Sequence, residues 1–230
     1  MRESTRHNDE ESETVPVSAG DKAYTGLKER ILRHELEMGA PLREEDVASW
    51  FGLSRVPARD ALRRLEQEGL IERNGRRYAI RSFSYQEVVI TYRQRAALEF
   101  LAVEHAIRHG AEALAPVADI LEQQRLALAE SSRPEFSKLD KAFHIAIANL
   151  SGQPLLVREL DIILDRVQLI RTAELQRDSG PKGAYNDHCR IFGALERGSA
   201  HVAQAELKYH YATTVRLHMD RAKSPHLPWD

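Results

Sequence analysis

Four side chains in the C-terminal half of the chain have types and spacings suited to a metal ion. Asp140 and His144 are four residues apart in the run KLDKAFHIAIANL, so both point to the same side of one helix. His188 lies ten residues before Gly198 and His210 lies twelve after it, so antiparallel helices joined there would hold both imidazoles at similar heights. Three imidazoles and one carboxylate that converge in a helical bundle suit Zn²⁺, Ni²⁺, Mn²⁺ or Fe²⁺. Taken alone, each histidine is more simply explained as a polar residue on a helix face.

Three other side chains of this region could also bind metal ions. His105 and His109 are again four residues apart, but no partner is expected to converge with them, and we interpret them as surface residues. Cys189 follows His188 and is rotated by about 100° around the helix, which favours a core position. Because Cys189 is the single cysteine, an internal disulfide is excluded, and the chain fits a reducing cytoplasm.

The residues that would position this cluster form an all-α domain. Helical periodicity continues from Ser82 almost to the C-terminus and is interrupted by glycine, serine and proline. The predicted helices are residues 84–109, 112–130, 134–150, 154–177, 184–197 and 199–222. On the fourth of these helices, Arg171 is a candidate to clamp an acidic ligand beside the metal.

The N-terminal half contains a helix-turn-helix pattern between Leu42 and Ile71. A first helix with Val47, Trp50 and Phe51 on its inward face is followed by Gly52. The second helix starts after the N-cap Ser54 and ends at Gly69. Its packing stripe is Ala58, Ala61, Leu62 and Leu65, whereas Arg55, Arg59 and Arg63 repeat on the other side. These arginines predict a recognition helix that enters a groove of double-stranded DNA.

A basic hairpin follows the second helix. Ile71–Arg73 and Tyr78–Ser82 read as short strands, and Asn74-Gly75 between them is a favoured hairpin turn. Arg76 lies at the tip, where it could reach the DNA backbone or the minor groove. Together with a preceding helix over residues 21–38, this pattern predicts a winged helix-turn-helix domain at residues 20–82.

The run GLSRVPARDALRRLEQEGLI resembles the GntR family of bacterial regulators. By this resemblance, Arg55 and Arg59 match positions that contact DNA, and the turn around Gly75 matches the tip of the wing. Glu45 stands where some members have an arginine, so no contact is expected from that position.

The C-terminal half, residues 83–223, resembles the FCD ligand-binding domain of the FadR-type branch, in its VanR-like, six-helix subgroup. Asp140, His144, His188 and His210 fill the four metal-ligand positions of the metal-binding members. Arg95 matches the arginine of the branch's R-x-x-x-E motif, and with Arg171 it would bind a small carboxylic or sugar acid. The resemblance implies a repressor whose DNA binding is modulated by that acid.

Composition and the chain ends set further expectations. The net charge of only −2 argues against a nonspecific polyanion binder, and no apolar run is long enough to span a membrane. Residues 1–19 and 224–230 are expected to be tails, the first disordered. We expect a cytoplasmic homodimer that reads an inverted repeat, because one winged helix covers too little DNA for specific binding.

Two other functions are compatible with the same residues. A metal-dependent hydrolase would need an activated water and a general base, and no H-E-x-x-H motif supplies them. It would also leave the helix-turn-helix unexplained. A DNA-binding protein with a purely structural metal differs from a sensor only in its response to small acids.

Overall fold

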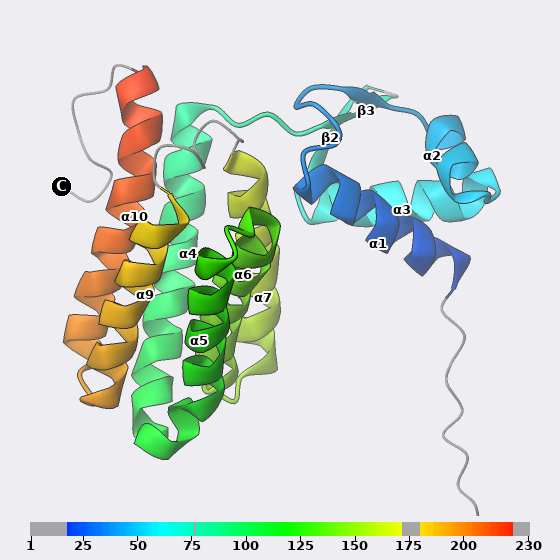
Figure 1. Cartoon of the computed structure of the whole chain (residues 1–230). Coiled ribbons are helices and arrows are strands. Elements are labelled where there is room, and N and C mark those ends of the chain that lie inside the picture. The colour runs from blue at the N-terminus through cyan, green and yellow to red at the C-terminus, as the bar shows by residue number, and fades with distance from the viewer. Residues whose placement is uncertain (1–17, 76, 172–179, 223–230) are drawn as a thin grey trace, which may run out of the picture.

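The chain forms a small mixed domain beside a bundle of long helices, as Figure 1 shows. The structure is a computed structural model and describes residues 18–75, 77–171 and 180–222. Both predicted tails lie outside these ranges, except that the first helix already begins at Ala19. Within the described ranges, no helix combines the length and apolar character needed to cross a membrane.

The mixed domain contains three helices and a three-stranded antiparallel sheet. Its elements are α1 (Ala19–Leu32), β1 (Pro41–Leu42), α2 (Glu44–Phe51), α3 (Arg55–Gln67), β2 (Ile71–Asn74) and β3 (Arg77–Ile80). The strand order is β1-β3-β2, and the register pairs Ile71 with Ile80 and Arg73 with Tyr78. The predicted hairpin is therefore present, with Gly75 at φ +63° in its turn. The sequence reading missed β1, whose two residues are too few to show a strand pattern.

Two predictions about this domain are wrong. Helix α1 ends at Leu32 and not at Met38, because the chain turns at His34, which adopts a left-handed conformation with φ +56°. Trp50 is not a core residue: 42% of it is exposed, and the guanidinium of Arg30 stacks on its ring at 4.4 Å. Val47 and Phe51 do pack into the core of the domain.

The bundle follows a short linker. Its helices are α4 (Tyr85–Ala106), α5 (Ala115–Ala129), α6 (Arg133–Asn149), α7 (Pro154–Ile170), α9 (Pro181–Glu196) and α10 (Ala200–Ala222). Short 3₁₀ turns, Ile107–His109 and Ala111–Leu114, join α4 to α5 around Gly110. Helix α4 starts with a capping box in which Ser84 and Glu87 satisfy each other's backbone N–H groups.

Helix α7 is shorter than predicted. It ends at Ile170, and Arg171 leaves the helical conformation with φ −70° and ψ 81°. Residues 172–177, which the sequence reading included in this helix, lie outside the described residues. Arg171 therefore caps the end of α7 and does not occupy the middle of a long helix.

The two domains share part of their hydrophobic packing. The core of the bundle joins residues of α4, α5, α6, α7, α9 and α10. The core of the mixed domain is built around Leu27, Leu62, Leu65 and Tyr78, and it also contains Leu169 from α7, which is fully buried. A residue of the second domain thus completes the core of the first.

Candidate functional site

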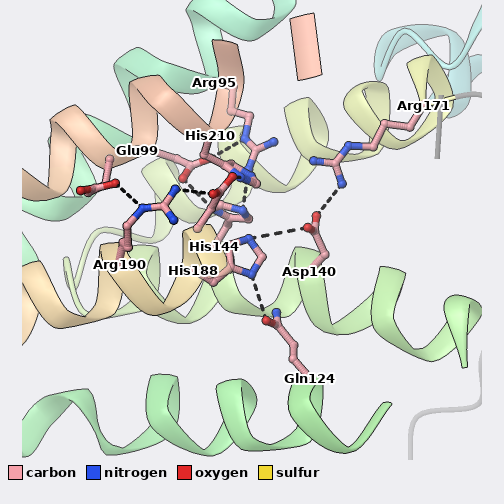
Figure 2. A network of polar contacts seen from close by, with 11 residues as sticks. Arg95, Glu99, Gln124, Asp140, His144, Arg171, His188, Arg190 and His210 are labelled. Atoms are coloured by element: carbon pink, nitrogen blue, oxygen red, sulfur yellow. Dashed lines mark hydrogen bonds and ion pairs between the residues drawn. The ribbon is translucent and has the colours of Figure 1, made fainter. Parts of the chain in front are cut away.

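The four predicted metal ligands meet inside the bundle (Figure 2). Helix α6 supplies Asp140 and His144 one turn apart, α9 supplies His188, and α10 supplies His210. All four side chains are buried. The left-handed Gly198, φ +64°, reverses the chain between α9 and α10, and this turn brings the last two imidazoles to the same height.

The ligand atoms are close enough for one ion. One nitrogen of each imidazole and one carboxylate oxygen all lie within 4.8 Å of one another. The Asp140 Oδ1 to His188 Nε2 distance is 3.6 Å. Opposite ligands of an ion with bonds of about 2.1 Å are about 4.2 Å apart, so small side-chain movements would complete the coordination.

Gln124 fixes the tautomer of His188. The amide Nε2 of Gln124 donates to the carbonyl oxygen of Leu139 at 2.9 Å, so its Oε1 must face the imidazole. His188 Nδ1 lies 2.9 Å from that oxygen and donates its proton to it. The lone pair of His188 therefore sits on Nε2, which points toward the other ligands. Phe143 stacks on the same ring with centroids 4.3 Å apart and holds its plane.

Carboxylates orient the other two imidazoles in the same way. His144 Nδ1 donates to Glu99 Oε2 at 2.7 Å, and His210 Nδ1 donates to Asp187 Oδ2 at 3.1 Å. A hydrogen bond from one ring nitrogen to a carboxylate or carbonyl is the usual support of a metal-bound histidine. All three rings consequently present Nε2 to a common centre.

The polar atoms at this centre fit a cation. Asp140 Oδ1 and His188 Nε2 are buried and have no hydrogen-bond partner among the described residues. Unpaired acceptors in a protein interior are costly and call for an explanation. Because both are acceptors, a metal ion satisfies them, whereas another hydrogen-bond acceptor would not.

Burial and nearby charges set the protonation states of Asp140 and His144. Burial alone would raise the pKa of the Asp140 carboxyl, but the Arg171 guanidinium and the imidazoles hold that pKa below its ordinary value. Burial lowers the pKa of His144 to about 4, an effect that Glu99 opposes only in part. At neutral pH the carboxylate is therefore charged and this imidazole is neutral, as coordination requires.

The two candidate effector ligands, Arg95 and Arg171, both touch predicted metal ligands. Arg171 Nη1 donates to Asp140 Oδ2 at 2.7 Å. Arg95 is fully buried, pairs with Glu99, and places Nη2 2.6 Å from His144 Nε2. That nitrogen has one lone pair, so coordination by His144 requires the Arg95 guanidinium to move away from it.

The sequence reading missed part of this site. Gln124 was not predicted, because it comes from α5, and a buried glutamine has no signature in a helical pattern. Cys189 was expected in the core and is exposed, so that prediction is wrong. His109 is exposed as predicted, and His105 is only half-buried.

The recognition helix presents the predicted arginines to solvent. Ala58, Ala61, Leu62 and Leu65 are fully buried along one side of α3, while Arg55, Arg59 and Arg63 are exposed on the other. Arg55 is 71% exposed and pairs with Glu45 at 2.9 Å, a contact that DNA phosphate or a base edge could replace. Arg76, predicted at the tip of the wing, lies outside the described residues.

Arg64, the remaining arginine of α3, has a structural role. Its guanidinium stacks on Tyr24 at 3.8 Å and donates to Asp21 at 2.6 Å, both on α1. It therefore joins two helices of the domain and is not directed at DNA.

Family comparisons agree with this architecture. Residues 19–79 match the model for bacterial regulatory proteins of the gntR family, and residues 91–213 match the FCD domain. YdhC of Bacillus subtilis (strain 168), a HTH-type transcriptional regulator, is 28% identical over 82% of this chain and 85% of its own length. The repressor RspR of Escherichia coli (strain K12) is 26% identical, with 86% of each chain covered.

Solved structures show the same fold. E. coli McbR/YncC superposes with a TM-score of 0.76 at 19% identity, covering 90% of this chain and 99% of that one. A GntR-type regulator from Rhodococcus sp. RHA1 superposes with a TM-score of 0.73 at 21% identity, over 86% of this chain and 97% of the other. The chain belongs to the GntR family and is a DNA-binding transcriptional regulator with a C-terminal FCD domain.

Proposed function

We propose that this regulator is a repressor whose affinity for DNA responds to a small carboxylic or sugar acid bound beside a divalent metal ion. The ion would be held by Asp140, His144, His188 and His210. The observation that carries the proposal is the set of three imidazole nitrogens and one carboxylate oxygen, all within 4.8 Å of one another. Nitrogen-rich ligands of this kind suit Zn²⁺, Ni²⁺, Mn²⁺ or Fe²⁺ and not Mg²⁺ or Ca²⁺.

The class of effector follows from the charges beside the ion. Four protein ligands leave open positions on a six-coordinate metal, and a carboxylate with a neighbouring hydroxyl could fill two of them. Arg95 and Arg171 add two guanidinium groups, which bind carboxylates in a bidentate manner. Arg95 Nη1 is buried without a hydrogen-bond partner among the described residues, so an acid would satisfy a donor that the protein leaves open.

DNA would be read by two copies of the winged helix in a homodimer bound to an inverted repeat. Arg55, Arg59 and Arg63 would enter the major groove, and the wing around Gly75 and Arg76 would reach the backbone or the minor groove. The named repressors among its relatives, such as RspR, support repression as the mode of action. We place this activity in the cytoplasm.

The test is a calorimetric titration of Zn²⁺, Ni²⁺ and Mn²⁺ into metal-free wild type and into His188→Ala. The wild type should bind one ion per chain, and the variant should bind much more weakly because it lacks one ligand. A thermal-shift screen of the metal-loaded protein against carboxylic and sugar acids then identifies the effector. Absence of any metal binding to wild type would refute the metal site.

A purely structural metal is the remaining alternative. It predicts that acids bind with equal affinity to wild type, chelator-treated wild type and His188→Ala. The proposed function instead predicts that the affinity for acids falls in the last two. Binding to a DNA duplex selected from a random pool by the wild type, measured with and without the acid, decides whether the response reaches the DNA.

A further inference from the structure

A buried carboxylate lies where the two domains meet. Asp165, on α7, is 1% exposed, although the side chain of Asp161, one turn earlier, is 42% exposed. Its Oδ2 lies 2.6 Å from Nζ of Lys28 on α1, and its Oδ1 lies 2.5 Å from Nζ of Lys141 on α6. One lysine belongs to the DNA-binding domain and the other to the bundle, so a single carboxylate bridges both.

The chain of contacts continues to the end of the recognition helix. Lys28 Nζ also pairs with Glu68 Oε2 at 3.0 Å, and Tyr24 donates to the other oxygen of Glu68 at 2.6 Å. Glu68 is the C-cap of α3. Its backbone carbonyl accepts a hydrogen bond of 2.6 Å from Nε of Arg166, the residue after Asp165. Both the side chain and the backbone of the helix end are therefore held by the same turn of α7.

Further contacts show that α7 docks specifically on the DNA-binding domain. Gln168 donates to the carbonyl of Leu32, the last residue of α1, and Leu169 completes the core of the DNA-binding domain. A Cβ at Gly69, next to the end of α3, would lie only 2.8 Å from Nε of Arg166. This close approach, together with a φ of +73°, favours glycine at the position.

The other end of the same network reaches the metal site. Lys141 follows the metal ligand Asp140 directly on α6, and Arg171, which caps α7, donates to the carboxylate of Asp140. A shift of Asp140 on coordination would therefore act on α7 through both Lys141 and Arg171. A segment of seven residues, 165–171, contacts the recognition helix at one end and a metal ligand at the other.

We propose that Asp165 is the positioning residue that couples the metal-binding bundle to the recognition helix, through Lys28 on one side and Lys141 on the other. This coupling rests on the proposed function, because it starts from metal binding at the proposed site. Metal binding would then change the position and stability of the C-terminal end of α3. Asp165 is the buried partner of both lysines, so neutralising it removes the one group that joins Lys28 to Lys141.

The test is hydrogen–deuterium exchange of residues 64–70, with and without saturating Zn²⁺, in wild type, Asp165→Asn and Asp161→Asn. Asparagine preserves the shape of aspartate and removes its charge. Asp161 is the matched control, because it also lies on α7 and pairs with Lys141 at 2.7 Å, but its side chain is 42% exposed. Calorimetry of Zn²⁺ binding is measured on the same three proteins.

In the metal-free proteins, exchange at residues 64–70 should be about tenfold faster in Asp165→Asn than in wild type and unchanged in Asp161→Asn. Zn²⁺ should slow this exchange in wild type and in Asp161→Asn. It should not do so in Asp165→Asn, although that variant still binds the ion. Equal exchange in metal-free wild type and Asp165→Asn, or equal slowing by Zn²⁺, would overturn the proposal.

If the chain does not bind a metal ion, the same experiment gives a different result. Wild type would then show no heat of Zn²⁺ binding, while the metal-free comparison would still decide whether Asp165 holds the recognition helix. If Asp165→Asn does not fold, Lys28→Met applies the same test from the other domain. It leaves Asp165 paired with Lys141 and should give the same accelerated exchange at residues 64–70.

Discussion

Replacing Gln124 with leucine tests whether the proposed metal site depends on the hydrogen bond that orients one imidazole. Gln124 does not reach the metal position: it accepts the Nδ1 proton of His188 and donates to the carbonyl of Leu139. Leucine has a similar length and neither function. His188 then loses the partner that keeps its lone pair on Nε2, and its ring becomes free to adopt the other tautomer or to rotate.

The size of the effect follows from these two hydrogen bonds. Loss of an outer partner of a metal-bound histidine typically lowers metal affinity by about 10–100-fold, or about 1.4–2.8 kcal/mol. The metal-free protein should lose about 1–3 kcal/mol of unfolding free energy, because the Nδ1–H of His188 is left buried without an acceptor. Removal of the ligand itself, in His188→Ala, should weaken metal binding further.

The assay is calorimetric titration of Zn²⁺ together with urea unfolding of the metal-free protein. Gln123→Leu is the matched control, since it makes the same substitution one residue away on the exposed side of α5. The control should bind Zn²⁺ as wild type does. If Gln124→Leu also retained the wild-type affinity, the tautomer argument for His188 would be refuted.

Four further predictions follow from the structure. Arg59→Ala should lower the affinity for selected operator DNA by about 1–3 kcal/mol at matched salt while thermal unfolding stays unchanged; intact specific binding would contradict the groove assignment. Leu169→Ala should destabilise the protein by about 2–5 kcal/mol and accelerate exchange in the DNA-binding domain, whose core it completes; an effect confined to the bundle would contradict the shared core. In chelator, the free energy of unfolding should fall as the pH is lowered from about 6.5 to about 4. The reason is that burial lowers the pKa of His144 to about 4, so the unfolded chain binds more protons in this window; urea titrations that do not change with pH would exclude it. Sedimentation should show a dimer both free and on DNA, and a monomer in both states would exclude the inverted-repeat arrangement.

Local sequence patterns were sufficient for the features that depend on one or two helices. The i,i+4 spacing placed Asp140 and His144 on one side of α6, and the turn at Gly198 set the heights of His188 and His210. The recognition helix likewise has the predicted buried stripe. In each case helical geometry alone relates sequence distance to spatial distance.

Features that depend on packing between distant elements could not be predicted in this way. Gln124 is 64 residues from His188, and Asp165 is 137 residues from Lys28, so no periodicity relates either pair. Trp50 was expected on the inward face of its helix, but it is 42% exposed and Arg30 stacks on its ring. Glutamine, aspartate and lysine are mostly exposed residue types, so only the docking of helices reveals the buried ones.

The composition of the proposed metal site suits a sensor that is built into a stable bundle. Arg95, Glu99, Asp140, His144 and His188 are buried where aliphatic side chains would otherwise fill the core. Buried ionic groups are often less favourable than apolar residues of the same volume, so the metal-free bundle gives up stability at this point. An ion present at 100 times its dissociation constant would return about 2.7 kcal/mol, because it binds only the folded chain. If the proposed site binds a metal, the buried charges that weaken the empty bundle would therefore link folding, metal binding and the docking of α7 to one another.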